Sequence, residues 1–182
     1  MSAKGDVRQV CARLRSAETR AELANILYHE VSGYSLFDLQ KMRARVERDL
    51  RSVPAGYRRR LYPSVMEQIF ETHHTLISTV RRGDLHGQDR PLPEEYQDFC
   101  NMVEMTCLRE DEGGQHLELL YFLLAAFNLF VLDRPAHPAG TPFPGGLEVE
   151  IRDGEYLCPV REKADNVPNA LCPYCPAKQT DG

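Results

Sequence analysis

The sequence lacks the patterns that identify a secreted protein or a membrane protein. Its opening residues do not have the basic-then-apolar order of a secretory signal. Its longest apolar stretch, residues 117–132, is short for a bilayer span and contains Glu118 and Asn128. We therefore expect a soluble protein of the cytoplasm with no membrane segment.

Motifs that carry catalysis are also missing. The glycine-containing stretch 140–146 is not followed by the Gly-Lys-Ser/Thr of a phosphate-binding loop, and no serine lies in a nucleophile elbow. Glu71 and His74 form a Glu-x-x-His pair, but a di-iron helical bundle needs a second pair and the sequence has none. These absences favour a protein that is not an enzyme.

Charge is divided unevenly along the chain, although the net charge is only −5. Residues 1–62 contain 13 Lys and Arg against 7 Asp and Glu, whereas the remainder contains 9 against 20. A basic segment of this kind can bind nucleic acid; the second explanation is that it pairs with the acidic part of its own chain or simply stays solvated. We favour the second explanation, so nucleic-acid binding is the last of three functional hypotheses.

Apolar residues recur at helical spacing through the first three quarters of the chain. Thr19 with Glu22, and then Ser35, predict helix starts through N-terminal capping. Gly83 predicts the end of a long helix that begins at about residue 57 and has Pro63 in its first turns. Residues 113–114 (Gly-Gly) predict the end of the next helix. Segment 117–132 is apolar on nearly every side, which is typical of a central buried helix.

The pattern changes after residue 134. Residues 137–146 (HPAGTPFPGG) are too rich in proline and glycine for regular structure. A β-hairpin is predicted from 147–152 and 155–158, because the intervening Asp153-Gly154 suits a tight turn. We predict a mainly α fold: a single helical domain of about five helices, residues 1–134, with residues 135–182 forming a loop, a hairpin and a Cys-rich metal-bound tail packed on it.

The six cysteines indicate metal or redox chemistry rather than disulfides, because clustered thiols in a reducing compartment seldom pair. Cys172 and Cys175 have the two-residue separation that lets both sulfurs bind one ion. Cys158, at the end of a predicted hairpin strand, is a third candidate ligand. The sequence therefore predicts a metal site in the tail.

A closed tetrahedral zinc site needs a fourth ligand from elsewhere in the fold. Cys107 is the first candidate, because it precedes a polar run at the end of its helix where the tail could approach. The other candidates are Cys100, His137 and His116.

The identity of the metal follows less directly from the sequence. Each tail cysteine precedes a proline, an arrangement found in ferredoxin-type cluster motifs and compatible with a zinc knuckle. We expect zinc, with an iron–sulfur cluster as the alternative. Cys-Pro-Tyr-Cys is also the active-site tetrapeptide of glutaredoxins, in which the motif precedes most of the fold. Only seven residues follow Cys175 in this sequence, so a glutaredoxin fold is excluded. A dithiol redox switch formed by Cys172 and Cys175 remains an alternative to metal binding.

The C-terminal third resembles an uncharacterised protein family of methanogenic archaea, domain of unknown function 2115. The resemblance is carried by three segments, 137–146, 156–160 (YLCPV) and 170–179 (ALCPYCPAKQ). It implies an archaeal, cytosolic and anaerobic setting, in which an iron–sulfur cluster would survive. It implies no activity.

Together these observations favour a non-enzymatic accessory or protein-interaction module with a structural Cys-ligated metal site. The partner would be a protein of unknown identity. The alternative is an iron–sulfur or dithiol redox component of an anaerobic enzyme system, and the third hypothesis is nucleic-acid binding through the basic N-terminal helices.

Overall fold

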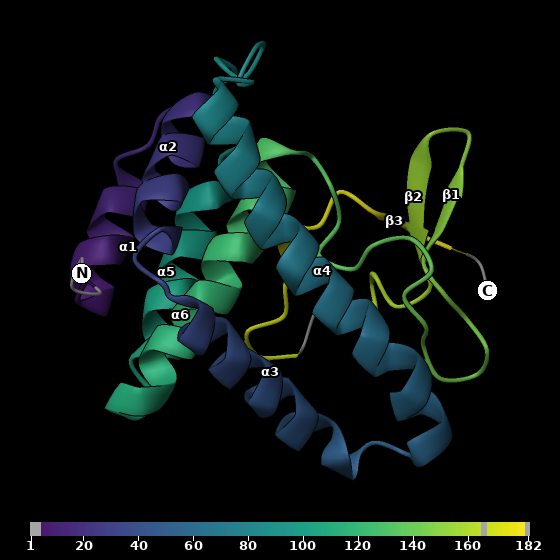
Figure 1. The fold of residues 1–182 in the computed structure, drawn as a ribbon. Coiled ribbons are helices and arrows are strands. Elements are labelled where there is room, and N and C mark those ends of the chain that lie inside the picture. The colour runs from purple at the N-terminus through teal and green to yellow at the C-terminus, as the bar shows by residue number, and fades with distance from the viewer. Residues whose placement is uncertain (1–4, 165–166, 181–182) are drawn as a thin grey trace.

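The computed structural model describes residues 5–164 and 167–180, and in these ranges it is mainly helical (Figure 1). The described α-helices are α1 (Val7–Arg15), α2 (Arg20–Val31), α3 (Leu36–Asp49), α4 (Ala55–Arg82), α5 (Tyr96–Cys107) and α6 (Glu112–Ala126). Short helical turns are η1 (Leu50–Ser52), η2 (Phe127–Val131) and η3 (Cys172–Tyr174). The strands are β1 (Glu150–Arg152), β2 (Glu155–Cys158) and β3 (Lys178–Gln179). The predicted mainly α class is confirmed.

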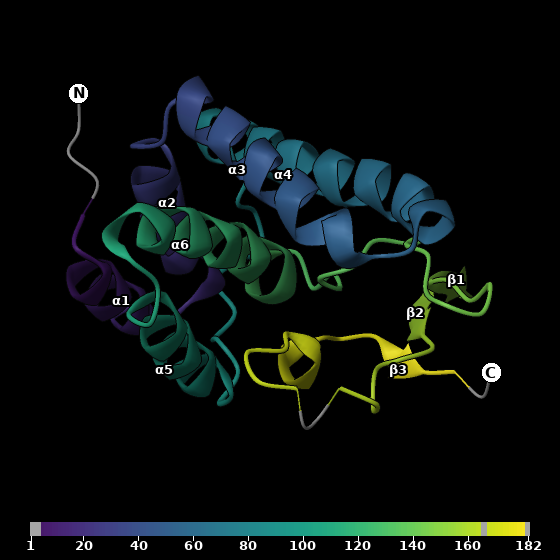
Figure 2. The same cartoon turned by 90° about the horizontal axis from the view of Figure 1, so that it is seen from below.

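Helix α6 lies at the centre of the helical body. Figure 2 shows it between the pair α3 and α4 on one side and the pair α1 and α5 on the other. Its second half is buried except for Tyr121, with Leu120 and Ala126 fully inaccessible to solvent. The predicted central position of segment 117–132 is confirmed. A helix that is apolar on nearly every side can bury that surface only when other helices surround it.

Several predicted helix ends are confirmed. Thr19 caps α2 and Ser35 caps α3, each through a reciprocal capping box, with Glu22 and Asp38 as the returning side chains. Gly83 ends α4 in the left-handed conformation, at φ 72°.

Two expectations are corrected. Residues 113–114 do not end a helix but lie in the first turn of α6, because Asp111 caps that helix by accepting a hydrogen bond from the Gly114 N–H at 2.7 Å. Helix α4 begins at Ala55, which places Pro63 in its third turn rather than its first turns. A proline there removes one helical hydrogen bond within an otherwise continuous helix.

A π-helical turn follows α6 directly and was not predicted. The turn η2 covers Phe127–Val131, and the Leu132 N–H donates to the Phe127 carbonyl at 3.0 Å. By length and composition alone, the continuous helix Gly113–Val131 could cross a membrane, the single such helix in the part of the chain that the structure describes. However, 67% of the apolar 18-residue segment of this helix is buried inside the fold, which is also typical of a core helix.

The C-terminal segment forms a small sheet beside the helical body (Figure 1). Strands β1 and β2 form the predicted antiparallel hairpin, and its turn places Asp153 and Gly154 at φ 51° and 82°. The third strand, β3, pairs parallel to β2 and brings the tail back along it. The Tyr57 hydroxyl on α4 donates to the Pro142 carbonyl at 3.0 Å, which connects the proline-rich loop to the helices.

Candidate metal centre

The three tail cysteines meet at one small cavity. Cys158 is the last residue of β2, while Cys172 opens the turn η3 and Cys175 follows it. The structure places all three in the lining of a cavity of about 10 Å³, and His137 from the proline-rich loop lines it as well. Donors from three separate segments of the chain therefore share one enclosed space.

Local geometry accounts for the position of each cysteine. In η3 the Cys175 N–H donates to the Cys172 carbonyl at 3.0 Å, so the chain turns back and the two thiols lie on the same side. Strand β3 pairs Cys158 with Gln179, and the Thr180 N–H donates to the Cys158 carbonyl at 3.2 Å. The parallel pairing of β2 and β3 thus brings Cys158 close to the other two.

Backbone donors point at one of these sulfurs, that of Cys175. Burial raises the pKa of the Cys175 thiol, while hydrogen bonds from the backbone N–H groups of Ala177 and Ala136 lower it. Burial also raises the pKa of Cys172, with the neighbouring thiols contributing in the same direction, and Arg161 opposes this for both cysteines. N–H groups directed at sulfur stabilise a thiolate, the form in which cysteine binds a metal.

His137 is the remaining donor at the cavity. Burial lowers the pKa of its imidazole, which favours the neutral ring that binds metals. The ring meets Phe143 edge to face, with the centroids 5.6 Å apart. Among residues 5–164 and 167–180, however, no three or more His, Cys, Asp and Glu side chains are arranged so that they could bind a metal ion. The four donors share a cavity without forming a coordination shell.

Cys107, the predicted fourth ligand, does not line this cavity. It is fully buried in the main core, and so are Cys100 and Cys11. Burial raises the pKa of all three thiols, to about 11 for Cys100 and about 12 for Cys11. His116, another candidate, precedes the buried half of α6 and also lies outside the cavity lining; its carbonyl accepts from the Tyr34 hydroxyl at 2.9 Å.

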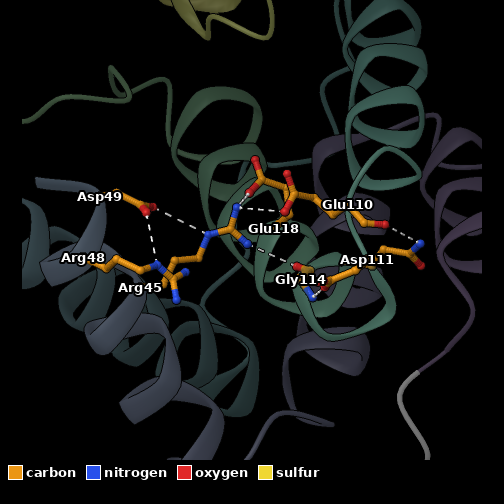
Figure 3. A network of polar contacts seen from close by, with 8 residues as sticks. Arg45, Arg48, Asp49, Glu110, Asp111, Gly114 and Glu118 are labelled. Atoms are coloured by element: carbon orange, nitrogen blue, oxygen red, sulfur yellow. Dashed lines mark hydrogen bonds and ion pairs between the residues drawn. The ribbon is translucent and has the colours of Figure 1, made fainter. Parts of the chain in front are cut away.

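Glu110, in the polar run that follows α5, contacts Arg45 of α3 (Figure 3). Arg45 approaches Glu110 to 3.5 Å and Glu118 to 2.5 Å, and it donates to the Gly114 carbonyl at 3.3 Å. The tail does approach the end of α5, as the sequence suggested, because the Thr106 hydroxyl lies 2.8 Å from the Asn169 side-chain oxygen. The residues that follow this helix end also contact an arginine of the basic N-terminal part.

Sequence reasoning missed the apolar side chains that anchor the tail. The Tyr174 ring contacts Phe99 edge to face at a centroid distance of 5.4 Å, and its centroid is 6.4 Å from that of Phe130. Leu171 is buried in the main core. The sequence contained one signal for this anchoring. Leu171 and Tyr174 are three positions apart, about one helical turn, so their side chains can lie on the same face of the tail.

The isolated Glu-x-x-His pair is not part of this centre. His74 is exposed, and Glu71 lines a different, larger cavity. Burial lowers the pKa of the neighbouring His73, which packs more deeply on the same helix.

Comparisons with known proteins support the resemblance seen in the sequence. The family model described as "Uncharacterized protein conserved in archaea (DUF2115)" matches residues 19–180. A UPF0305 protein of Methanothermobacter thermautotrophicus is 32% identical over 145 residues, covering 80% of this chain and 86% of the relative. A UPF0305 protein of Methanopyrus kandleri is 31% identical over 126 residues, covering 69% of this chain and 86% of the relative. A UPF0305 protein of Methanocaldococcus jannaschii is 25% identical over 162 residues, covering 88% of this chain and 96% of the relative. No solved structure matches. The chain therefore belongs to the family described as "Uncharacterized protein conserved in archaea (DUF2115)".

Proposed function

We propose that this protein is a non-enzymatic accessory or interaction module whose tail is fastened to the helical body by one zinc ion. Its ligands would be Cys158, Cys172, Cys175 and His137. The observation that carries the proposal is the shared cavity, which three thiols and one imidazole from three segments line together. Three cysteines and one histidine make a donor set common in structural zinc sites.

The size of the cavity favours a structural role over a catalytic one. A volume of about 10 Å³ accommodates about one small sphere, and no substrate could enter beside a bound ion. Four protein donors would also complete the tetrahedron and leave no open position for chemistry.

A metal at this point would act mainly on the order of the C-terminal segment. It would connect the end of β2, the turn η3 and the proline-rich loop. Since the free energy of metal binding at such a site is partly free energy of folding, the ion would stabilise the tail more than the helices. Leu171 and Tyr174 supply an apolar contribution of their own, so the metal reinforces an existing contact.

The interaction part of the proposal is supported by an exposed apolar pair at the start of α3. Leu36 is 71% exposed and Phe37 is 66% exposed, and the Lys41 ammonium lies 4.7 Å from the centre of the Phe37 ring. Two adjacent large apolar side chains in solvent are a feature of protein contact surfaces.

Metal analysis of protein purified without oxygen tests the proposal. We expect about one zinc per chain and a colourless sample. A brown protein that contains iron and absorbs visible light would instead support the iron–sulfur alternative. Protein with neither metal, whose tail resists proteolysis as well before and after chelator treatment, would contradict both.

Single variants then identify the ligands. Cys172→Ser, Cys175→Ser and His137→Gln should each lose the metal and expose the chain to trypsin at Arg161 or Lys163 while the helices stay folded. Cys107→Ala is the matched control, because it removes a buried thiol that lies outside the cavity. Loss of metal from Cys107→Ala, with full retention in His137→Gln, would refute this ligand set.

A further inference from the structure

A second and much larger cavity lies beside the proposed metal centre. Its volume is about 440 Å³, within the range of small-molecule sites. One wall is formed by α4 and another by η2 and the residues that follow it, while the proline-rich loop and Tyr156 of the hairpin close the remainder. Figure 1 shows α4 crossing the molecule between the helical body and the hairpin, which places this cavity where the two parts of the fold meet.

A buried polar pair lines this cavity. Asn128 is 8% exposed and Thr72 is 6% exposed, and the Asn128 side-chain amide donates to the Thr72 hydroxyl oxygen at 2.9 Å. Within the described ranges, the side-chain Oδ1 of Asn128 accepts no hydrogen bond from protein, and the Thr72 hydroxyl donates none. One acceptor and one donor of this pair therefore remain available to a ligand in the cavity.

The π-helical turn is what brings Asn128 to the cavity. Asn128 is the second residue of η2, and its carbonyl accepts from the Arg134 N–H at 2.8 Å as the chain leaves the helix. A π-turn changes the direction of the side chains that follow it, and such turns are frequent at functional sites.

Charges of both signs line the same cavity as the polar pair. Glu67 and Glu71 lie one turn apart on α4, and Arg134 lies on the opposing segment after η2. In the part of the chain that the structure describes, none of the three forms an ion pair. Two carboxylates four residues apart on a helix repel each other, and a cation between them would relieve that repulsion.

We infer that this cavity binds a small zwitterion, a molecule of amino-acid to dipeptide size that carries an ammonium group and a carboxylate. The ammonium would lie between Glu67 and Glu71, and the carboxylate would bind Arg134, whose guanidinium matches its geometry. The Asn128 and Thr72 pair would bind polar atoms between the two charged ends. The inference does not depend on zinc, although Pro135 lines both this cavity and the cysteine cavity.

Titration of the isotope-labelled full chain, as purified, tests the inference by nuclear magnetic resonance. The probes are 6-aminohexanoate and L-lysine, which carry both charges, with hexylamine and hexanoate as the corresponding single-charge compounds. We expect a zwitterion to give saturable shifts that include the Asn128 side-chain amide, with an affinity about tenfold or more above either single-charge compound.

Charge-neutral variants assign the two ends. Glu67→Gln with Glu71→Gln should reduce the affinity for 6-aminohexanoate to that for hexanoate, and Arg134→Gln should reduce it to that for hexylamine. Glu94→Gln, an exposed carboxylate outside the cavity, is the control. Absence of saturable shifts with both zwitterions, or equal affinities in the wild type and the cavity variants, would overturn the inference.

Discussion

Arg45 on α3 approaches Glu118 on α6 to 2.5 Å between the guanidinium and a carboxylate oxygen. Both side chains are less than one fifth exposed, and the same arginine contacts Glu110 and Asp49. An arginine of the basic N-terminal part is thus neutralised by the acidic remainder of the chain (Figure 3). Arg15 with Glu104 and Arg20 with Asp133 repeat this arrangement. These pairs support the explanation that much of the basic segment serves the chain's own fold.

Replacement of Arg45 should therefore weaken the packing of α3. Arg45→Met leaves two partly buried carboxylates without their cation, and we expect a loss of about 2 kcal/mol in the free energy of unfolding, between the values for exposed and buried pairs. Urea denaturation followed by circular dichroism measures this. Arg48→Met is the control, because Arg48 is 66% exposed and lies 3.7 Å from Asp49, which is 60% exposed. Equal losses in the two variants would contradict the importance of the network.

Glu118 should make stability depend on pH. Burial raises the pKa of its carboxyl above the ordinary value of 4.5, and Arg45 opposes this shift. The folded state then binds the proton more tightly than the unfolded state, so this contribution is present below about pH 4.5 and is lost as pH rises through the higher folded-state pKa. Relative to Glu118→Gln, the wild type should gain stability as pH falls from neutrality toward about 4.5. Parallel urea midpoints across that window would exclude the effect.

Tyr174 should contribute to the anchoring of the tail through its ring alone. Tyr174→Ala removes the contacts with Phe99 and Phe130, and we expect a loss of about 3 kcal/mol with faster proteolysis of the tail. Tyr174→Phe retains the ring, and in the described part of the chain its hydroxyl makes no hydrogen bond, so its stability should match the wild type. A large loss in Tyr174→Phe would show that the hydroxyl matters.

Thiol labelling should divide the six cysteines into two groups. After treatment with a chelator, the partly exposed Cys172 and Cys175 should react first in the folded protein, and the nearly buried Cys158 more slowly. The three core cysteines, Cys11, Cys100 and Cys107, should react only in denaturant, because burial removes access and raises their pKa values. Mass spectrometry counts the modified residues. Labelling of Cys107 before Cys172 in folded protein would contradict the burial described above.

The candidate site was predictable in part. The Cys-x-x-Cys spacing and the hairpin that ends at Cys158 are local features, and these three residues do share a cavity. The fourth donor was harder to select, since Cys107, Cys100, His137 and His116 all lie outside the local motif. Of these, His137 alone lines the cavity, and that depends on the path of the proline-rich loop.

The sequence by itself determined the local elements of this protein: the capped starts of α2 and α3, the glycine end of α4, the central apolar helix and the Asp153-Gly154 hairpin. Each depends on interactions between residues a few positions apart, so spacing and side-chain chemistry suffice to predict it. Only the tertiary structure decided where separate segments meet. The parallel pairing of β3 with β2, the burial of Tyr174 against Phe99 and the π-turn that brings Asn128 to Thr72 all join residues distant in the chain. Such contacts depend on the packing of whole helices and loops, which no local pattern specifies.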